Sequence, residues 1–258
     1  MAQPALRRWF RGLTAVTLTG IAACLLVGCV SPKYKHAGKS APPVLALNVS
    51  FPPAPPLNAT LYTVITFGGA GSWKREAFWD EYVVTLRNEG DQPVEVDSFV
   101  LADYADVSHP PGDDPWTLER QSKDLERKYR DAGMAFARIA APRVLAATAE
   151  PAVLTGAGIG SAGAAAAAAT TAVALPVYGL TVLGINSHNK AAIKAEFTRR
   201  RLPLPLRLGP GEMRTGSLFF PMIPNPRSLT LHWSNESDRA DSVLPLDVLS
   251  GLHIKTDR

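Results

Sequence analysis

The two thiols of the chain, Cys24 and Cys29, both lie in one short apolar stretch near the N-terminus. A cysteine thiolate is a good nucleophile, so the chemistry expected here is attachment of a group to sulfur. No cysteine follows Cys29, and a chain that begins at Cys29 therefore has no partner for a disulfide. A chain of this length is able to bury an ample core without one.

The residues before these thiols have the order of an export signal. Three arginines come first, and an uncharged run from Leu13 to Val27 follows them. A run of about 15 residues is short for a membrane-spanning helix and suits the apolar core of a signal peptide. We therefore predict that the N-terminal segment directs the chain out of the cytoplasm.

The residues Leu26, Val27, Gly28 and Cys29 resemble the lipobox that ends the signal peptide of bacterial lipoproteins. The resemblance implies that residues 1–28 are removed and that Cys29, lipidated on its thiol, becomes the N-terminus. It also implies that no transmembrane helix is needed, because several acyl chains hold a protein firmly at a bilayer.

The alternatives to Cys29 stay open. The sequence IAAC at 21–24 fits the same pattern, but Cys24 would leave an apolar core of only about ten residues, so we prefer Cys29. An ordinary signal peptide and an uncleaved anchor are the other two interpretations. Val30 follows Cys29 where aspartate would indicate inner-membrane retention, so the resemblance favours the outer membrane, facing the periplasm.

The charge of the chain argues against nucleic acid as a partner. The net charge is +4, and residues 1–28 account for most of it, since they hold three arginines and no acidic residue. The chain after residue 28 is nearly neutral, and it offers no strongly cationic surface for a phosphate backbone.

Alternation of apolar and polar residues predicts a β-rich body after a polar, proline-tipped tether at 29–43. We expect strands at 44–51, 61–67, 80–88 and 94–103, with 51–60 as an extended proline-rich piece. The residues at 89–93 are typical of a turn, so strands 80–88 and 94–103 are predicted to form a hairpin.

The stretch VTLRNEGDQPVEV at 84–96 resembles the hairpins of immunoglobulin-like sandwiches. Further strands are predicted within 202–221, 227–233 and 243–255. The expected fold class is α+β: an antiparallel immunoglobulin-like β-sandwich, built from 44–112 and 202–258. A helical Ala/Gly-rich insertion at 113–201 interrupts it.

The insertion begins with a helix start signal, Asp114 as N-cap and Pro115 as the first residue. An amphipathic helix is predicted from there to about Pro142, and Leu118, Leu125, Tyr129 and Phe136 share its apolar face. A second helix is predicted at 189–201.

Between these helices, residues 152–185 carry no charged side chain. Small residues recur there at four-residue spacing, which lets helices approach closely inside lipid. We therefore predict that this segment contacts membrane or a partner through Gly156, Gly160, Gly163 and Ala167. Soluble packed helices and partial disorder are the alternatives. The string GIGSAG at 158–163 matches a dinucleotide motif but lacks its strand and acidic residue, so no nucleotide is expected.

The densest polar cluster is the loop ADYADVSHPPGDD at 102–114. Its carboxylates and His109 are donors that a divalent ion accepts, but their spacing matches no calcium motif. The simpler interpretation is a solvated loop whose last aspartates cap the following helix. We predict no metal, no cofactor and no catalytic residue.

The sequence thus predicts a lipid-anchored envelope protein that acts as a non-catalytic binding or assembly module. Its expected partners are the membrane, through Cys29, and an envelope protein. The runner-up is a membrane-inserting oligomer, a pore or scaffold, formed through 152–185. An enzyme that uses the loop from Asp103 to Asp114 is the third hypothesis.

Overall fold

The computed structural model describes residues 35–36, 46–138, 175–236 and 238–255, with only the backbone for 35–36 and 175–186. The chain divides into two units. One comprises Met1–Lys33 and Thr171–Asn186, and the other comprises Tyr34–Thr170 and Ser187–Arg258. The second unit is called the body below.

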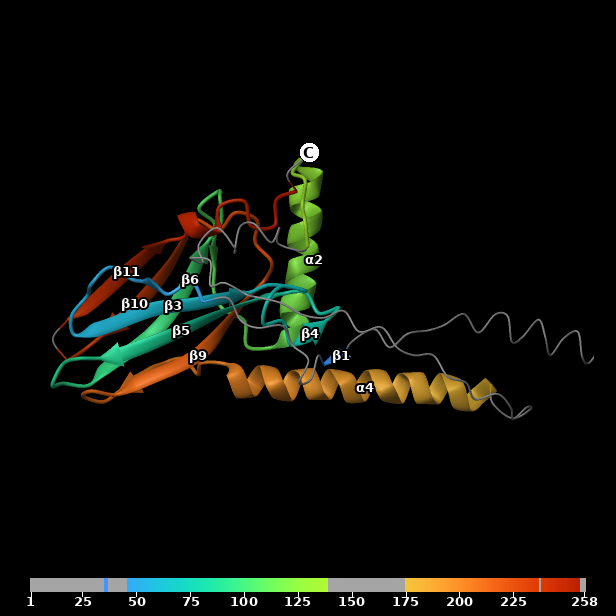
Figure 1. The fold of residues 1–258 in the computed structure, drawn as a ribbon, viewed down its shortest axis with the longest axis horizontal. Helices are drawn as coiled ribbons and strands as arrows, with labels where there is room; N and C mark the ends of the chain where they lie inside the picture. The colour runs from blue at the N-terminus through green and yellow to red at the C-terminus, as the bar shows by residue number, and fades with distance from the viewer. Residues whose placement is uncertain (1–34, 37–45, 139–174, 237, 256–258) are drawn as a thin grey trace, which may run out of the picture. The chain divides into compact units, whose positions relative to one another are not determined.

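Two antiparallel β-sheets form the body (Figure 1). The first has the order β2-β3-β5-β9, with β2 at Val49–Ser50, β3 at Leu57–Ile65, β5 at Asp80–Asn88 and β9 at Met213–Phe220. The second has the order β11-β10-β6-β7, and β8 also pairs with β6. Its strands are β6 at Val94–Ala102, β7 at Ser108–His109, β8 at Leu206–Leu208, β10 at Ser228–Ser234 and β11 at Arg239–Pro245. A separate pair joins β1 at Lys35–His36 to β4 at Lys74–Arg75.

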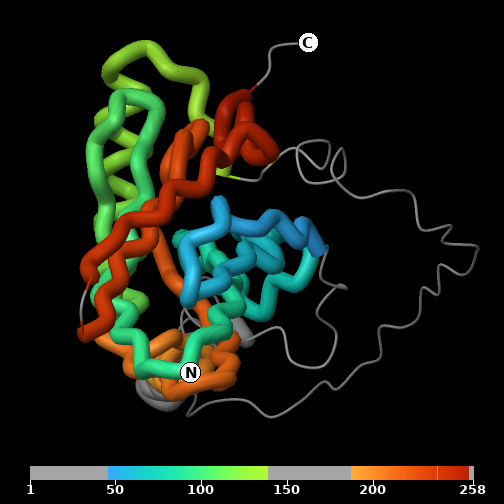
Figure 2. The backbone as a smooth tube through the Cα atoms, turned by 90° about the vertical axis from the view of Figure 1, so that its left-hand side faces the viewer, coloured from blue at the N-terminus to red at the C-terminus, as the bar shows by residue number. Residues whose placement is uncertain are grey.

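Strands from the two ends of the sequence share both sheets. β9 pairs with β5 from Phe220 opposite Asp80 to Met213 opposite Arg87. β10 pairs with β6 along its whole length, and Figure 2 shows the orange-to-red C-terminal strands beside green β6. Each sheet therefore combines strands that precede the helices in the chain with strands that follow them.

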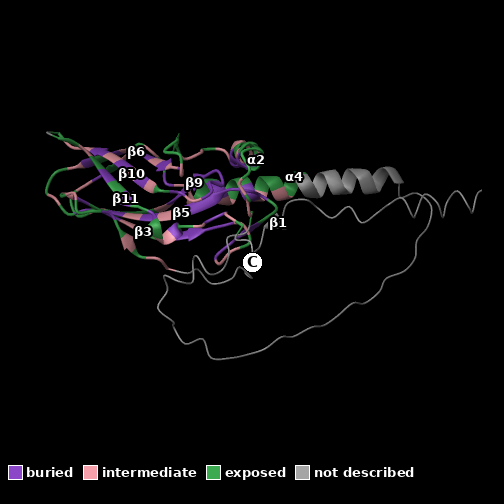
Figure 3. Ribbon diagram, turned by 90° about the horizontal axis from the view of Figure 1, so that it is seen from above, coloured by how far each residue is buried: buried purple, intermediate pink, exposed green. Residues whose placement is uncertain are grey.

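The core lies between the two sheets. One face of β5 supplies Tyr82, Val84 and Leu86, and one face of β10 supplies Leu229, Leu231 and Trp233. Because successive side chains of a strand point to opposite faces, the alternation in the sequence places these residues inward. Buried residues follow the strands of both sheets in Figure 3. The prediction of a largely antiparallel two-sheet body is confirmed at this level.

The predicted hairpin of strands 80–88 and 94–103 is wrong. The two strands form as expected, but β5 belongs to the first sheet and β6 to the second. The connection bridges the sheets because both strands bury an apolar face in the same core. The side-chain amide of Asn88 holds it there, donating to the carbonyls of Gln92 at 2.8 Å and of Leu208 at 3.1 Å.

Other boundaries also differ from the sequence prediction. β3 starts at Leu57, inside the stretch expected to be a proline-rich connection, and the strand expected at 44–51 is reduced to β2. The last predicted strand, 243–255, is replaced by β11 and a short 3-10 helix, η2, at Asp247–Leu249. β1 lies within the predicted tether and pairs with β4, so the tether is partly bound to the body.

Two longer helices lie between β7 and β8. α2 spans Pro115–Asp131, and Asp114 caps it as predicted, accepting a hydrogen bond from the Thr117 N–H at 3.0 Å. α2 ends earlier than predicted because Gly133 takes a φ of 81°, which a helix cannot continue through. α4 spans Leu175–Arg200, so it begins well before the predicted residue 189. Among the described helices, none has both the length and the apolar character required to cross a membrane.

Candidate functional site

The residues that the sequence predicts to meet lipid or a partner lie outside the described part of the chain. These are Cys29, Gly156, Gly160, Gly163 and Ala167. Their roles therefore stay predictions.

The acidic loop after β6 is described, and its carboxylates bind different partners. Asp103 is buried and accepts hydrogen bonds from the Tyr129 hydroxyl at 2.6 Å and the Val107 N–H at 2.9 Å. Asp106 pairs with Arg227 at 3.0 Å, and Asp114 caps α2. Within the described residues, no group of three or more His, Cys, Asp or Glu side chains is arranged to hold a metal ion.

The pKa shifts of Asp103 and Tyr129 also indicate that the pair has a structural role. Burial alone would raise the pKa of its carboxyl, but the hydrogen bonds from Tyr129 and from the N–H groups of Val107 and Ala105 bring it below its usual value. Burial and the neighbouring Asp103 raise the pKa of Tyr129 well above its ordinary range. The pair therefore ties the loop to α2 in a fixed charge state.

The most unusual site of the body lies where α4 meets the first sheet. Buried aromatic side chains surround it, and the Phe197 and Phe219 rings stack with centroids 4.0 Å apart. Trp79 packs edge-on against Phe197 at 5.9 Å. Trp73, Phe78 and Trp79 are all buried. Ionisable groups enter this apolar environment from β4, β5 and α4. We call Lys74, Glu81 and Arg200, with Trp73 and Ser217, the α4 junction.

Glu81 is the centre of the α4 junction. Its side chain is completely buried. It accepts hydrogen bonds from Trp73 Nε1 at 2.5 Å and from Ser217 Oγ at 2.6 Å. Arg200 Nη1 lies 3.4 Å from Glu81 Oε1 and adds a charge of opposite sign. Both carboxylate oxygens are therefore engaged.

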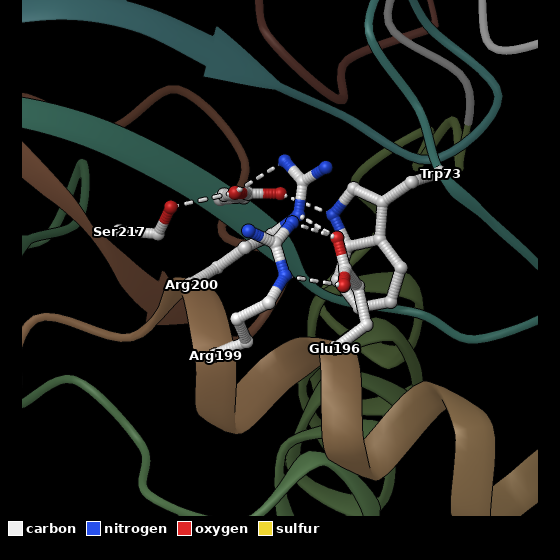
Figure 4. Close-up of polar contacts among 6 residues, drawn as sticks. Trp73, Glu196, Arg199, Arg200 and Ser217 are labelled. Atoms are coloured by element: carbon white, nitrogen blue, oxygen red, sulfur yellow. Dashed lines mark hydrogen bonds and ion pairs between the residues drawn. The ribbon is translucent and has the colours of Figure 1, made fainter. Parts of the chain in front are cut away.

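A second carboxylate extends the network along α4. Glu196 accepts hydrogen bonds from Arg200 Nε at 2.7 Å and from Arg199 Nε at 2.8 Å. The Arg199 hydrogen bond is the main cause that lowers the pKa of Glu196 to about 2. Figure 4 shows Glu196, Arg199 and Arg200 side by side on α4, near Trp73 and Ser217. Arg200 thus links the last turn of α4 to the buried Glu81.

Lys74 is the least satisfied member of the α4 junction. Its side chain is only 1% exposed, and its ammonium lies 4.8 Å from the centre of the Trp79 ring. Nζ has no hydrogen-bond partner among the described residues. Burial lowers the pKa of Lys74 to about 8, although Glu81 and Asp80 oppose the shift. A buried charged amine without a hydrogen-bond partner destabilises the folded state.

Asp80, the residue of β5 directly before Glu81, lies on the opposite face of the strand and meets His253. His253 Nε2 lies 2.7 Å from Asp80 Oδ2, and Nδ1 lies 3.0 Å from the Ala137 carbonyl oxygen. A carbonyl and a carboxylate both only accept, so both ring nitrogens carry protons. Burial alone would lower the pKa of His253, but the attraction and hydrogen bond of Asp80 raise it.

The engagement of these groups limits their chemistry. His253 has no free nitrogen to take up a proton, and Ser217 directs its hydroxyl to Glu81. A general base needs an available lone pair beside the group that it activates. The arrangement instead clamps α4, β4 and the C-terminal segment onto the sheets.

The sequence did carry a signal for the α4 junction that its analysis missed. The stretch WKREAFWDEY at 73–82 places five charged residues among four aromatic ones. Charged side chains among so many aromatic ones require partners if the stretch is buried, since an unpaired buried charge is costly. The partners Ser217 and Arg200 come from distant segments, so the stretch alone could not identify them.

Comparison with protein-family models, with curated protein sequences and with solved structures found no match to this chain.

Proposed function

We propose that this chain is a bacterial envelope lipoprotein, anchored through Cys29. Its β-sandwich body would act as a non-catalytic binding or assembly module on the periplasmic side of the outer membrane. The observation that carries the proposal is the lipobox-like sequence at 26–29, followed after a short tether by a two-sheet body.

The described ionisable clusters support a role without catalysis. The buried carboxylates Glu81, Asp80 and Asp103 all serve to join segments of the body. A catalytic acid or base must reach a substrate, and each of these three is at most 1% exposed. Their positions favour rigidity of the body over turnover.

The immunoglobulin-like part of the proposal concerns architecture. Two antiparallel sheets enclose one core, and the chain passes from one sheet to the other between β5 and β6. In immunoglobulin constant domains the second and third strands lie in different sheets. Here the consecutive strands β2, β3 and β5 share one sheet, so the likeness does not extend to strand order.

A sheet edge offers a place for a protein partner. β9 pairs with β5 on one side, while on its other side Arg201 and Leu202 meet Ser217 and the Gly112 N–H donates to the Phe219 carbonyl, both in the second half of the strand. The start of β9 is exposed, and Met213 has 61% of its surface accessible. An exposed edge accepts an extended segment of another chain as an added strand. We propose such a segment as the occupant.

Replacement of Cys29 by alanine is expected to abolish incorporation of an alkyne-labelled palmitate and to release the protein from washed membranes. The reason is that Cys29 would provide the only thiol left after cleavage. Cys24→Ala is the matched control and should be labelled like the native chain. Labelling of Cys29→Ala would contradict the proposal. Retention of the unlabelled variant in the membrane would favour the alternatives, an uncleaved N-terminal anchor or a membrane-inserting oligomer through 152–185.

A photo-crosslinking amino acid at position 213 is expected to give a discrete adduct in intact cells, because Met213 lies at the open edge of β9. Val107 provides a control position, since it is exposed to a similar extent, 44%, but lies outside β9. An adduct of one size from position 213 and not from position 107 supports docking at this edge. Equal adducts from both positions would exclude it.

A further inference from the structure

We propose that the face of the body formed by β4 and residues 187–201 rests on the bilayer and contacts its anionic lipid headgroups. The inference rests on the proposed lipidation of Cys29 and adds an orientation to it. The three turns at the opposite end of the sheets would then face away from the membrane.

The length of chain between the anchor and the body carries the argument. β1 pairs with β4, with Lys35 opposite Arg75 and His36 opposite Lys74. Only five residues lie between Cys29 and Lys35, so the two are six Cα-to-Cα steps apart. Six residues of fully extended chain reach at most about 20 Å. A lipidated Cys29 therefore keeps the backbone of β4 close to the headgroups.

The opposite end of the sheets is too distant for the same tether. β5 begins at Asp80, shortly after β4, and runs nine residues to Asn88. A strand of nine residues is about 30 Å long. The turn at 89–93 follows that far end, and strand register places the turns at 209–212 and 235–238 beside it. Val94 pairs with Leu208, the Asn88 N–H donates to the Glu212 carbonyl, and Ser234 pairs with Glu95.

The net charges of residues 187–201 and of the three far turns differ in sign, although several of these side chains are paired: Lys194 with Asp114, Arg199 with Glu196, Glu89 with Arg87 and Glu212 with Arg214. Residues 187–201 hold five basic side chains and one acidic side chain. Of these, Lys190, Lys194 and Arg199 are exposed. Arg75 on β4 is exposed as well. The three turns at the far end hold five acidic residues and no basic one: Glu89, Asp91, Glu212, Glu236 and Asp238.

These charges and the tether favour the same orientation. The surface potential of an anionic leaflet attracts basic side chains within about one Debye length, roughly 8 Å at physiological salt. The same potential repels the carboxylates of the far turns. β4 is held near α4, because Trp73, directly before β4, shares a buried cluster with Ile193 and Phe197 and lies 5.2 Å from the Arg200 guanidinium. The short tether therefore brings residues 187–201 to the headgroups together with β4.

The test uses the lipidated full chain in vesicles of phosphatidylcholine and phosphatidylglycerol that contain a headgroup-nitroxide lipid. The mature chain has no free thiol, so one introduced cysteine accepts a fluorophore. Ala195→Cys and Gln92→Cys are a matched pair, since both residues are exposed and uncharged. We expect nitroxide quenching several-fold stronger at position 195 than at position 92. Equal quenching, or stronger quenching at position 92, would overturn the orientation.

Two further arms isolate the causes. A glycine-serine insertion after Val30 lengthens the tether and is expected to reduce the quenching difference between positions 195 and 92. Vesicles of phosphatidylcholine alone should also reduce it, and an unchanged difference there would overturn the role of anionic headgroups. An intact mass without acyl chains would instead show that the proposed lipidation has failed, which separates that failure from a wrong orientation.

Discussion

Glu81→Ala is expected to lower the free energy of unfolding of the body by about 3–5 kcal/mol, the usual cost of removing one partner from a buried ion pair. The substitution removes the acceptor of the Trp73 indole N–H and of the Ser217 hydroxyl. It also leaves the buried ammonium of Lys74 without its strongest electrostatic partner. Each donor left unsatisfied adds to the loss.

Urea unfolding followed by tryptophan fluorescence measures this effect, in a Cys29→Ala background that removes the proposed lipid. Glu89→Ala is the control, because the Glu89 side chain forms an exposed pair with Arg87 and its loss should change stability by less than about 0.5 kcal/mol. Glu81→Gln keeps the shape of the side chain and should fall between the two. A loss below about 1 kcal/mol for Glu81→Ala would contradict the central role of this carboxylate.

Local patterns in the sequence were sufficient for most individual strands but not for their pairing. The alternation in 80–88 predicted β5 with its observed bounds, since one face of that strand is buried in the core. The same alternation could not reveal that 94–102 pairs with 228–234. Two strands joined by a short turn look alike in sequence whether they share a sheet or face each other across a core. The hydrogen bonds of Asn88 to the distant carbonyls of Leu208 and Gly209 decide between the two.

Neighbouring residues likewise predicted where α2 begins, whereas contacts between distant segments could not be predicted. Asp114 and Pro115 predicted the start of α2 because capping depends on neighbouring residues. The α4 junction depends on Glu81, Arg200 and Ser217, which are more than a hundred residues apart in the chain at the widest. Only the strand register of β5 and β9, with Glu81 and Ser217 on one face, brings them together.

The buried pair of His253 and Asp80 contributes stability to the body that decreases as the pH rises. The folded-state pKa of His253 is raised, so its contribution is complete below the ordinary histidine pKa and is lost as the pH rises through the folded-state value. The α4 junction acts in the other direction through Lys74. The two effects are separable, because a substitution at Lys74 leaves the pair of His253 and Asp80 in place.

Lys74→Met is expected to raise the free energy of unfolding by about 2–3 kcal/mol at pH 7, in the range found when buried charges are replaced by apolar side chains. The lowering of the pKa of Lys74 from 10.5 to about 8 is the physical cause. Each pKa unit corresponds to about 1.4 kcal/mol, so the buried ammonium costs roughly 3 kcal/mol while the group is charged. Glu81 keeps Arg200, Trp73 and Ser217 as partners in the variant.

The pH dependence makes the Lys74 prediction specific. Between pH 8 and 10.5 the unfolded chain binds this proton more strongly than the folded chain, so native stability gains from Lys74 as the pH rises. The advantage of Lys74→Met should therefore be complete below pH 8 and should shrink toward pH 10. Arg75→Met, at the exposed neighbouring position, should be nearly neutral at both values. A stability difference between Lys74→Met and the native chain that stays constant from pH 7 to pH 10 would show that Lys74 is not held charged in an apolar environment. A destabilised variant would show that its contacts with Trp73 and Trp79 outweigh the cost of burying its charge.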